Sequence, residues 1–158
     1  MNRDLVRGSE EYWYGDLPED WDVLQLVRCL DLVKGGSWGS EPEGDESDRV
    51  CLRVSDFDYD RLRIDPSNLT VRSQSFDDSD DRILRDGDLL IEKSGGGEKT
   101  LVGRCVLFRG EMKNPTYSNF VSLLRPNGRM TSEFMVYLMS SLYGGYLNYP
   151  SVKQTTGI

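Results

Sequence analysis

Residues 86–109 read DGDLLIEKSGGGEKTLVGRCVLFR, and their pattern sets the type of fold that the sequence predicts. Residues 88–92 form the short apolar run of a buried strand, and residues 102–108 resume β structure. The glycines from Gly95 to Gly97 separate the two runs, and glycine lets a backbone adopt positive φ and approach a ligand closely. We therefore predict two strands joined by a lysine-flanked loop.

Further strands are predicted on both sides of this segment, at residues 50–54, 68–72 and 118–124. Nearer the start, the apolar residues between positions 23 and 33 predict a strand followed by a short helix, which ends at the glycine pair 35–36. The polar loop after this pair carries Trp38, and long loops within compact domains are more often functional than not.

One longer helix is predicted near the end of the sequence. Thr131 or Ser132 caps its first turn, Glu133 favours that turn, and apolar residues then recur at helical spacing until Gly144. Several strands with few helices predict an α+β domain, built on a twisted, mostly antiparallel β-sheet with a few short helices. We expect a poorly ordered lead-in at residues 1–16, followed by a single domain at residues 17–158.

Composition excludes several classes of function. The 158 residues include no histidine, which removes His-based triads and His-ligated metals. Cys29, Cys51 and Cys105 are far apart, so we expect reduced thiols in the core rather than a zinc site or a disulfide framework. No apolar stretch is long enough to span a bilayer and the start does not resemble a signal peptide, so a soluble, cytoplasmic protein is expected.

The glycine-rich segment does not predict catalysis. Glu98, not glycine, precedes Lys99, so the Gly-x-x-x-x-Gly-Lys-Ser/Thr pattern of a phosphate-binding loop is not met. Asp88, Glu92 and Lys93 resemble a nuclease cluster, but adjacent residues of a strand point to opposite faces. We therefore expect a protein that is not an enzyme and that needs no cofactor or metal.

The net charge of −8 is unevenly distributed along the chain. Residues 1–92 carry 11 basic and 24 acidic side chains, whereas residues 93–129 carry seven basic and two acidic ones. A polyanionic partner would have to meet this central basic block. From local sequence alone, a flexible connection with solvated lysines explains the glycine run better than a DNA-facing loop does.

Five segments, in order, resemble the specificity subunits of type I restriction–modification systems. They are LPEDWDVLQL, GGSWGS followed by VCLRVSDFD, GDLLIEKSGGGEKTLVGRCVLF, SNFVSLLRP, and the terminal TTGI. The resemblance covers roughly residues 17–158 and identifies the chain as similar to one target-recognition domain of such a subunit. It implies recognition of one half of a split site in double-stranded DNA. It also implies adenine-N6 methyltransferase and restriction subunits as partners, with no catalytic residues in this chain.

The sequence departs from the family pattern in holding one such domain and in lacking the long spacer helix, so a shortened chain or a half-length subunit is expected. Two alternatives stay open at this point. One is a protein-interaction module without a role in nucleic-acid binding, in which the acidic first half contacts a basic partner. The other is the recognition domain of a fused restriction–methylation enzyme.

We expect the DNA contacts to come from three loops and the basic block, through phosphates and base edges. The predicted contact residues are Lys34, Ser37, Trp38, Lys93, Ser94, Gly95, Gly96, Lys99, Arg104, Lys113, Asn114 and Asn119. Trp38 and Tyr117 are candidates for aromatic residues next to DNA, but a packing role is favoured for both. Asp56 and Asp58 could accept hydrogen bonds from cytosine amino groups, but a structural role in turns is favoured. A solvated loop is the alternative for the polar residues after position 112.

Overall fold

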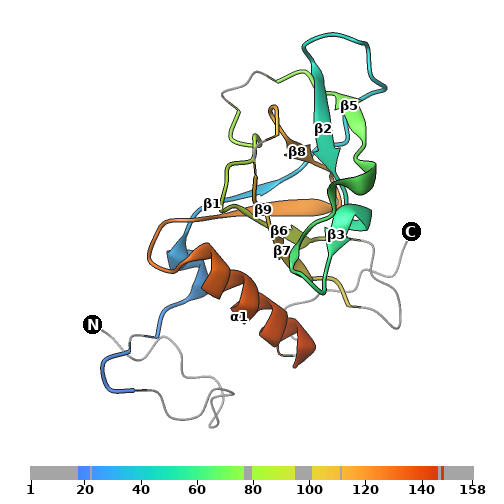
Figure 1. Cartoon of the computed structure of the whole chain (residues 1–158). Coiled ribbons are helices and arrows are strands. Elements are labelled where there is room, and N and C mark those ends of the chain that lie inside the picture. The colour runs from blue at the N-terminus through green and yellow to red at the C-terminus, as the bar shows by residue number, and fades with distance from the viewer. Residues whose placement is uncertain are drawn as a thin grey trace.

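Two sheets and one long helix make up the part of the chain that the structure describes (Figure 1). This computed structural model describes residues 18–21, 23–76, 80–94, 101–110, 112–145 and 147. The predicted lead-in at residues 1–16 lies outside the described residues.

The larger sheet has six strands in the order β1-β9-β6-β7-β4-β3. Their bounds are Leu30–Gly35 (β1), Val121–Pro126 (β9), Leu89–Glu92 (β6), Cys105–Leu107 (β7), Arg63–Ile64 (β4) and Phe57–Asp58 (β3). Every neighbouring pair is antiparallel except β4 and β7, which run parallel. The predicted strands on either side of the glycine run are therefore confirmed as β6 and β7, and the α+β class is confirmed.

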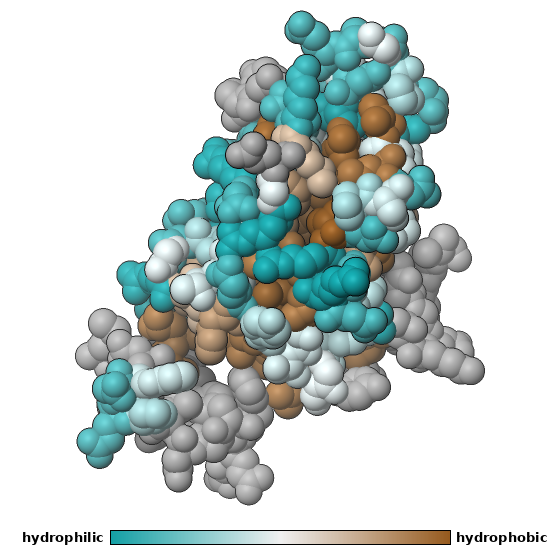
Figure 2. All heavy atoms as spheres, in the orientation of Figure 1, coloured by the Kyte–Doolittle hydropathy of each residue, from teal (hydrophilic) through white to brown (hydrophobic). Residues whose placement is uncertain are grey.

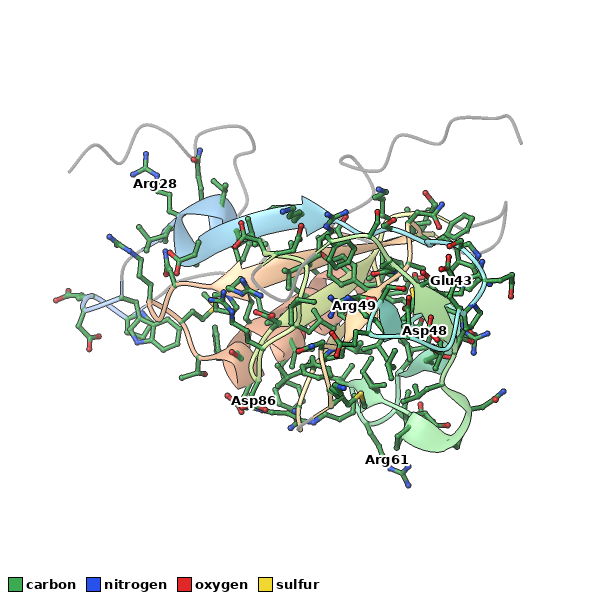
Figure 3. The ribbon with its side chains drawn as sticks, turned by 90° about the horizontal axis from the view of Figure 1, so that it is seen from above. Arg28, Glu43, Asp48, Arg49, Arg61 and Asp86 are labelled. Carbon is green, nitrogen blue, oxygen red and sulfur yellow. The ribbon has the colours of Figure 1, made fainter. Side chains whose placement is uncertain are left out.

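The smaller sheet has three strands in the order β5-β2-β8, with bounds Val71–Ser73 (β5), Asp48–Leu52 (β2) and Thr116–Tyr117 (β8). The loop before β2 is closed by Asp48, whose carboxylate accepts hydrogen bonds from the amides of Glu43 and Gly44 at 2.9 and 2.8 Å (Figure 3). This sheet and its loop form the upper part of the molecule in Figure 1.

Helix α1 (Ser132–Gly144) confirms the predicted helix and its cap, because the Thr131 hydroxyl accepts a hydrogen bond from the Phe134 amide at 3.2 Å. The helix buries Met135 and Val136 in a hydrophobic cluster with residues of β6, β7 and β9. A second cluster fills the space between the two sheets, where Leu52 and Tyr117 lie beside Leu90 and Val106. The prediction of reduced core thiols is confirmed: Cys29, Cys51 and Cys105 are free and buried.

The early segment differs from its prediction. A 3₁₀ helix (η2, Leu26–Cys29) precedes strand β1, so the predicted order of strand and helix is wrong. The physical reason is that a short apolar run fits either element, and the glycine pair does not end a helix. A Cβ at Gly36 would lie 2.3 Å from the carbonyl oxygens of both Tyr117 and Ser118, so glycine is required where the chain passes β8.

Two other strands are shorter than predicted. The 3₁₀ helix η4 (Pro66–Asn68) occupies the start of the segment predicted at 68–72, which leaves only β5. The segment predicted at 118–124 begins with a turn, because the Val121 amide donates to the Ser118 carbonyl at 3.0 Å. Among the described residues, no helix is long and apolar enough to cross a membrane.

Candidate nucleic-acid interface

A groove of about 520 Å³ brings together three of the predicted contact residues. It is lined by Trp38, Arg53, Val54, Ser55, Ser94, Ser118, Asn119 and Phe120. These residues come from the loop after β1, the turn after β2, the end of β6 and the turn before β9. Segments far apart in the sequence therefore form one surface, which we call the aromatic groove.

The loop that carries Trp38 is held against both sheets. The amide of Gly36 donates to the Val121 carbonyl at 3.1 Å, and that of Ser37 donates to the Tyr117 carbonyl at 3.0 Å. Trp38 is 37% exposed, and its ring lies 4.7 Å from the guanidinium of Arg72. The tryptophan is thus fixed on one side and open to the groove on the other.

The opposite wall is formed where β6 ends beside the turn before β9. The amides of Lys93 and Ser94 both donate to the Phe120 carbonyl, at 2.9 and 3.3 Å. The Phe120 side chain is 46% exposed, and Asn119 is exposed next to it. Lys93 is also exposed and makes no ion pair with any residue that the structure describes.

Arg53 borders the groove but is held by a structural carboxylate. Its guanidinium donates to Asp56 at 2.7 Å and to the Asn68 carbonyl at 3.1 Å. The hydrogen bond with Asp56 raises the pKa of Arg53 above its ordinary value. Asp56 is buried, and the Asp58 carboxylate accepts from the amides of Asp60 and Arg61 at 3.1 and 3.0 Å. The turn roles considered for both aspartates are therefore confirmed.

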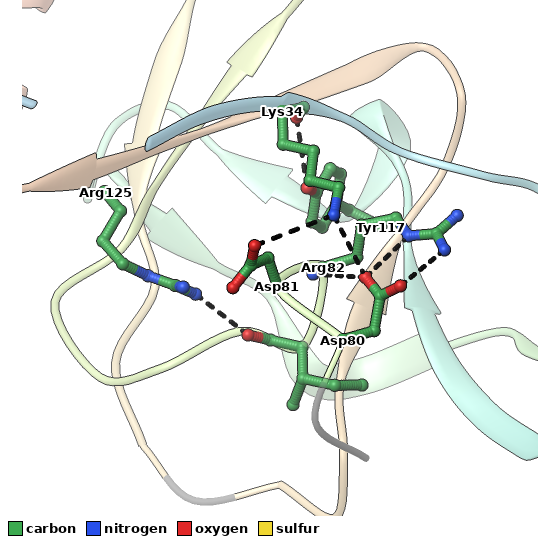
Figure 4. A network of polar contacts seen from close by, with 7 residues as sticks. Lys34, Asp80, Asp81, Arg82, Tyr117 and Arg125 are labelled. Carbon is green, nitrogen blue, oxygen red and sulfur yellow. Dashed lines mark hydrogen bonds and ion pairs between the residues drawn. The ribbon is translucent and has the colours of Figure 1, made fainter. Parts of the chain in front are cut away.

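Lys34 lies away from the aromatic groove, in a polar network with two aspartates (Figure 4). Its ammonium is 3.5 Å from Asp80 and 4.0 Å from Asp81. The side chain of Arg82 donates to Asp80 at 2.7 and 2.8 Å and lowers the pKa of this carboxyl. Tyr117 is buried and donates its hydroxyl hydrogen to the Lys34 carbonyl at 3.1 Å, so it is a packing residue.

Lys113 and Asn114 line a different hollow, of about 680 Å³, beside the smaller sheet. Arg49 and Phe76 line it too, and the guanidinium of Arg49 lies 5.4 Å from the Phe76 ring. Figure 3 shows Arg49 among the strands, whereas Arg61 points outward. Asn114 has a φ of 47°, in the left-handed region that asparagine tolerates better than most residues.

Arg104 is enclosed by aromatic rings. Its guanidinium lies 4.6 Å from the ring centre of Tyr59 and 5.3 Å from that of Tyr143. The remaining predicted contacts, Gly95, Gly96 and Lys99, lie outside the described residues.

The described basic residues of the central block do not form one surface. Arg125 of β9 pairs with the buried carboxylate of Asp88 at 2.8 Å, and Arg109 pairs with Asp86 and Glu133. These pairs lie at the end of β6 and β9 opposite to the aromatic groove. The expectation that the whole block meets one polyanion is therefore wrong for Arg109 and Arg125, because carboxylates of this chain already neutralise them.

Five residues of the groove are absent from the predicted contacts: Arg53, Val54, Ser55, Ser118 and Phe120. Ser118 is a buried polar residue at the start of a predicted strand. Phe120 carried a usable signal, since it is an aromatic residue next to Asn119 at the start of a predicted strand. The first three lie at the end of a predicted strand and just after it, and nothing in the local pattern indicates that they face Trp38.

Two solved structures resemble this fold. The HsdS subunit from Thermoanaerobacter tengcongensis matches with a TM-score of 0.55 and 17% identity, over 85% of this chain and 31% of that chain. A chain from a study of complex assembly and conformational transition of the type I restriction–modification system matches with a TM-score of 0.57 and 16% identity, over 92% of this chain and 33% of that chain.

This chain thus spans about a third of the length of both structures. No family model and no curated protein matches the sequence. The resemblance in fold to type I specificity subunits, which the sequence predicts, is confirmed.

Proposed function

We propose that this chain reads one half of a split DNA site and directs the methyltransferase and restriction subunits of a type I restriction–modification system to it. The single observation that carries the proposal is the aromatic groove, where Trp38, Ser94 and Asn119 meet on a fold shared with specificity subunits. Lys93 precedes Ser94, and its ammonium makes no ion pair with the residues that the structure describes.

The groove offers each type of contact that duplex recognition requires. The side-chain amide of Asn119 can donate to and accept from a base edge, and the exposed rings of Trp38 and Phe120 can contact a thymine methyl group. Lys93 supplies a positive charge for a phosphate, which positions the protein without specifying sequence. Because these groups lie on loops held by two sheets, their relative positions are fixed.

The proposal assigns chemistry to the partner subunits. The two carboxylates considered for catalysis are engaged in structure, since Asp88 binds Arg125 and Glu92 accepts hydrogen bonds from Tyr59 and Arg104. Adenine-N6 methylation and cleavage then belong to the other subunits. The protein would act in the cytoplasm, where the DNA and these partners are found, and would need no cofactor of its own.

Selection from a random duplex library tests this function, because the recognised sequence need not be chosen in advance. We expect the whole chain to enrich a short consensus at low salt, and its affinity to fall steeply as salt rises. Trp38→Ala and Asn119→Ala should lose the consensus. Tyr137→Ala, which removes an aromatic residue exposed on α1, is the matched control and should keep it. Salt-insensitive binding, or enrichment of no consensus, would contradict the proposal.

Binding to a protein partner is the second candidate, and helix α1 favours it. Phe134 and Tyr137 are exposed on α1, whereas Met135 and Val136 of the same helix are buried. Figure 2 shows hydrophobic atoms reaching the surface around α1, whereas the loop between β1 and β2 is mostly hydrophilic. If α1 binds the methyltransferase subunit, Phe134→Ala should weaken complex formation and leave DNA selection unchanged.

A further inference from the structure

The base of the segment between β6 and β7 is closed by Glu92 and Arg104. The amide of Glu92 donates to the Arg104 carbonyl at 2.9 Å. The Glu92 carboxylate accepts a hydrogen bond from the Arg104 amide at 3.3 Å. Because one residue uses both its backbone and its side chain on the same partner, the two strands are joined at this point more firmly than by the ladder alone.

Tyr59 ties this base to the turn after β3. Its hydroxyl donates to the Glu92 carboxylate, and its ring lies beneath the Arg104 guanidinium. Phe57 holds the ring edge-on, with 6.0 Å between the ring centres. Burial, then the hydrogen bond with Glu92, raises the pKa of Tyr59, so that the hydroxyl keeps its proton and donates at neutral pH.

Tyr143 ties the same base to the last turn of α1. Its hydroxyl donates to the Leu101 carbonyl at 2.9 Å, and its ring faces Arg104 at 5.3 Å. A hydrogen bond with the Tyr143 hydroxyl raises the pKa of Arg104 above its ordinary value. The turn after β3 and helix α1, which are distant in sequence, therefore both hold the base that Glu92 and Arg104 form.

We infer that Tyr59, Glu92, Arg104 and Tyr143 form a clamp that positions the end of β6, and with it Lys93 and Ser94, for DNA binding. Arg104, predicted from the sequence as a DNA contact, acts as a positioning residue. The inference rests on the proposed function, because Lys93 and Ser94 follow Glu92 directly and Ser94 lines the aromatic groove. Loosening the clamp would displace this wall of the groove without removing any group that touches DNA.

Amide hydrogen exchange in the free protein tests the clamp. Tyr59→Phe removes one hydroxyl, and Tyr59→Phe combined with Tyr143→Phe removes both. We expect exchange at the Glu92 and Arg104 amides to become about tenfold faster in the double variant. The reason is that the Glu92 carboxylate and the Arg104 guanidinium each lose a hydrogen bond with a tyrosine hydroxyl. The amides that join β1 to β9 should exchange as before.

Tyr137→Phe is the control, since Tyr137 is exposed on α1. Unchanged exchange at Glu92 and Arg104 in the double variant would overturn the clamp. If the double variant does not fold, Tyr59→Phe alone decides, with a smaller but measurable acceleration expected.

DNA binding separates positioning from direct contact. Arg104→Met should lower affinity several-fold and leave the slope of log K against log salt unchanged, because no phosphate contact is lost. A slope that becomes shallower by about one unit would overturn the inference, since it would place Arg104 on a phosphate. A wild-type protein that binds no DNA would overturn the proposed function, while the exchange experiment would still decide whether the clamp exists.

Discussion

The two ends of β6 and β9 carry basic residues from the same stretch of sequence and use them in opposite ways. One end lies beside the start of α1, and we call it the helix end; the other, at the aromatic groove, is the groove end. At the helix end, Arg125 forms an ion pair with Asp88, and Arg109 pairs with Asp86 and Glu133. At the groove end, Lys93 is exposed and unpaired among the described residues, next to the open rings of Trp38 and Phe120.

The difference shows that the charge of a segment does not identify a binding surface. A basic side chain that already faces a carboxylate of its own chain adds little to the field that a polyanion meets. The charge of Lys93, which no described carboxylate compensates, and the exposed groups that can contact bases are the reasons for proposing the groove end as the binding surface. The helix end is then expected to matter for stability, and the groove end for binding.

Removing Asp88 should have the largest effect of all the changes, and this effect should be on stability and not on DNA binding. Asp88 is 2% exposed and accepts from Arg125 through both carboxylate oxygens. Asp88→Ala leaves a buried guanidinium without its partner, so we expect the free energy of unfolding to fall by about 3–5 kcal/mol in chemical denaturation. Asp86→Ala, at an exposed pair of the same end, is the control and should change it little. Equal effects would break the comparison.

Gly36→Ala should have the next largest effect, at the groove end. Its methyl group would lie 2.3 Å from two backbone oxygens, so the loop that carries Trp38 must move. We expect a loss of about 1–3 kcal/mol in the free energy of unfolding, together with loss of DNA selection. Gly144→Ala is the matched control, because an added methyl group there meets open space. A Gly36→Ala protein that keeps both properties would contradict the groove geometry.

Much of the fold was predictable, because some segments carry more than one local signal. Helix α1 has a cap at Thr131 and apolar residues at helical spacing, and β6 is an apolar run ended by glycines. The segment before Gly35 carries only a short apolar run, which fits a strand and a helix equally well. The site was predictable only in part, because the wall containing Phe120 depends on a turn that separates β8 from β9.

Truncating the aromatic rings of the groove should have a moderate effect on binding and a small one on stability. Trp38→Ala or Phe120→Ala removes a ring that is exposed over much of its surface. We expect about tenfold weaker binding to the selected duplex, measured by fluorescence anisotropy. Phe134→Ala, similarly exposed on α1, is the control. Weaker DNA binding in the control than in the groove variants would reverse the assignment of the two ends.

The smallest effect on stability is expected from replacing Asp80. This residue forms an ion pair with Lys34, as the carboxylates of the helix end do with Arg109 and Arg125. The hydrogen bond from Arg82 lowers the pKa of Asp80 below its ordinary value of 3.8. A carboxyl with a lowered folded pKa stabilises the protein above its unfolded pKa, and this contribution is lost as the pH falls below about 4.

We therefore expect stability to decline less steeply between about pH 4 and pH 2 in Asp80→Asn than in the wild-type protein. Acid titration of the denaturation midpoint measures this decline. Asp81→Asn is the control, since that carboxylate lies 4.0 Å from Lys34. Identical pH profiles for Asp80→Asn and the wild-type protein would show that the ionised Asp80 carboxylate does not stabilise the fold. They would contradict its role in neutralising Lys34.

The salt dependence of DNA affinity tests the division between the two ends most directly. Lys93→Met removes a cation beside the groove that pairs with no described carboxylate, and Arg109→Met removes a paired cation at the helix end. The slope of log K against log salt is negative. We predict that it becomes shallower by about one unit for Lys93→Met and stays unchanged for Arg109→Met. An unchanged slope for Lys93→Met together with a shallower slope for Arg109→Met would show that DNA meets the opposite end of the sheet.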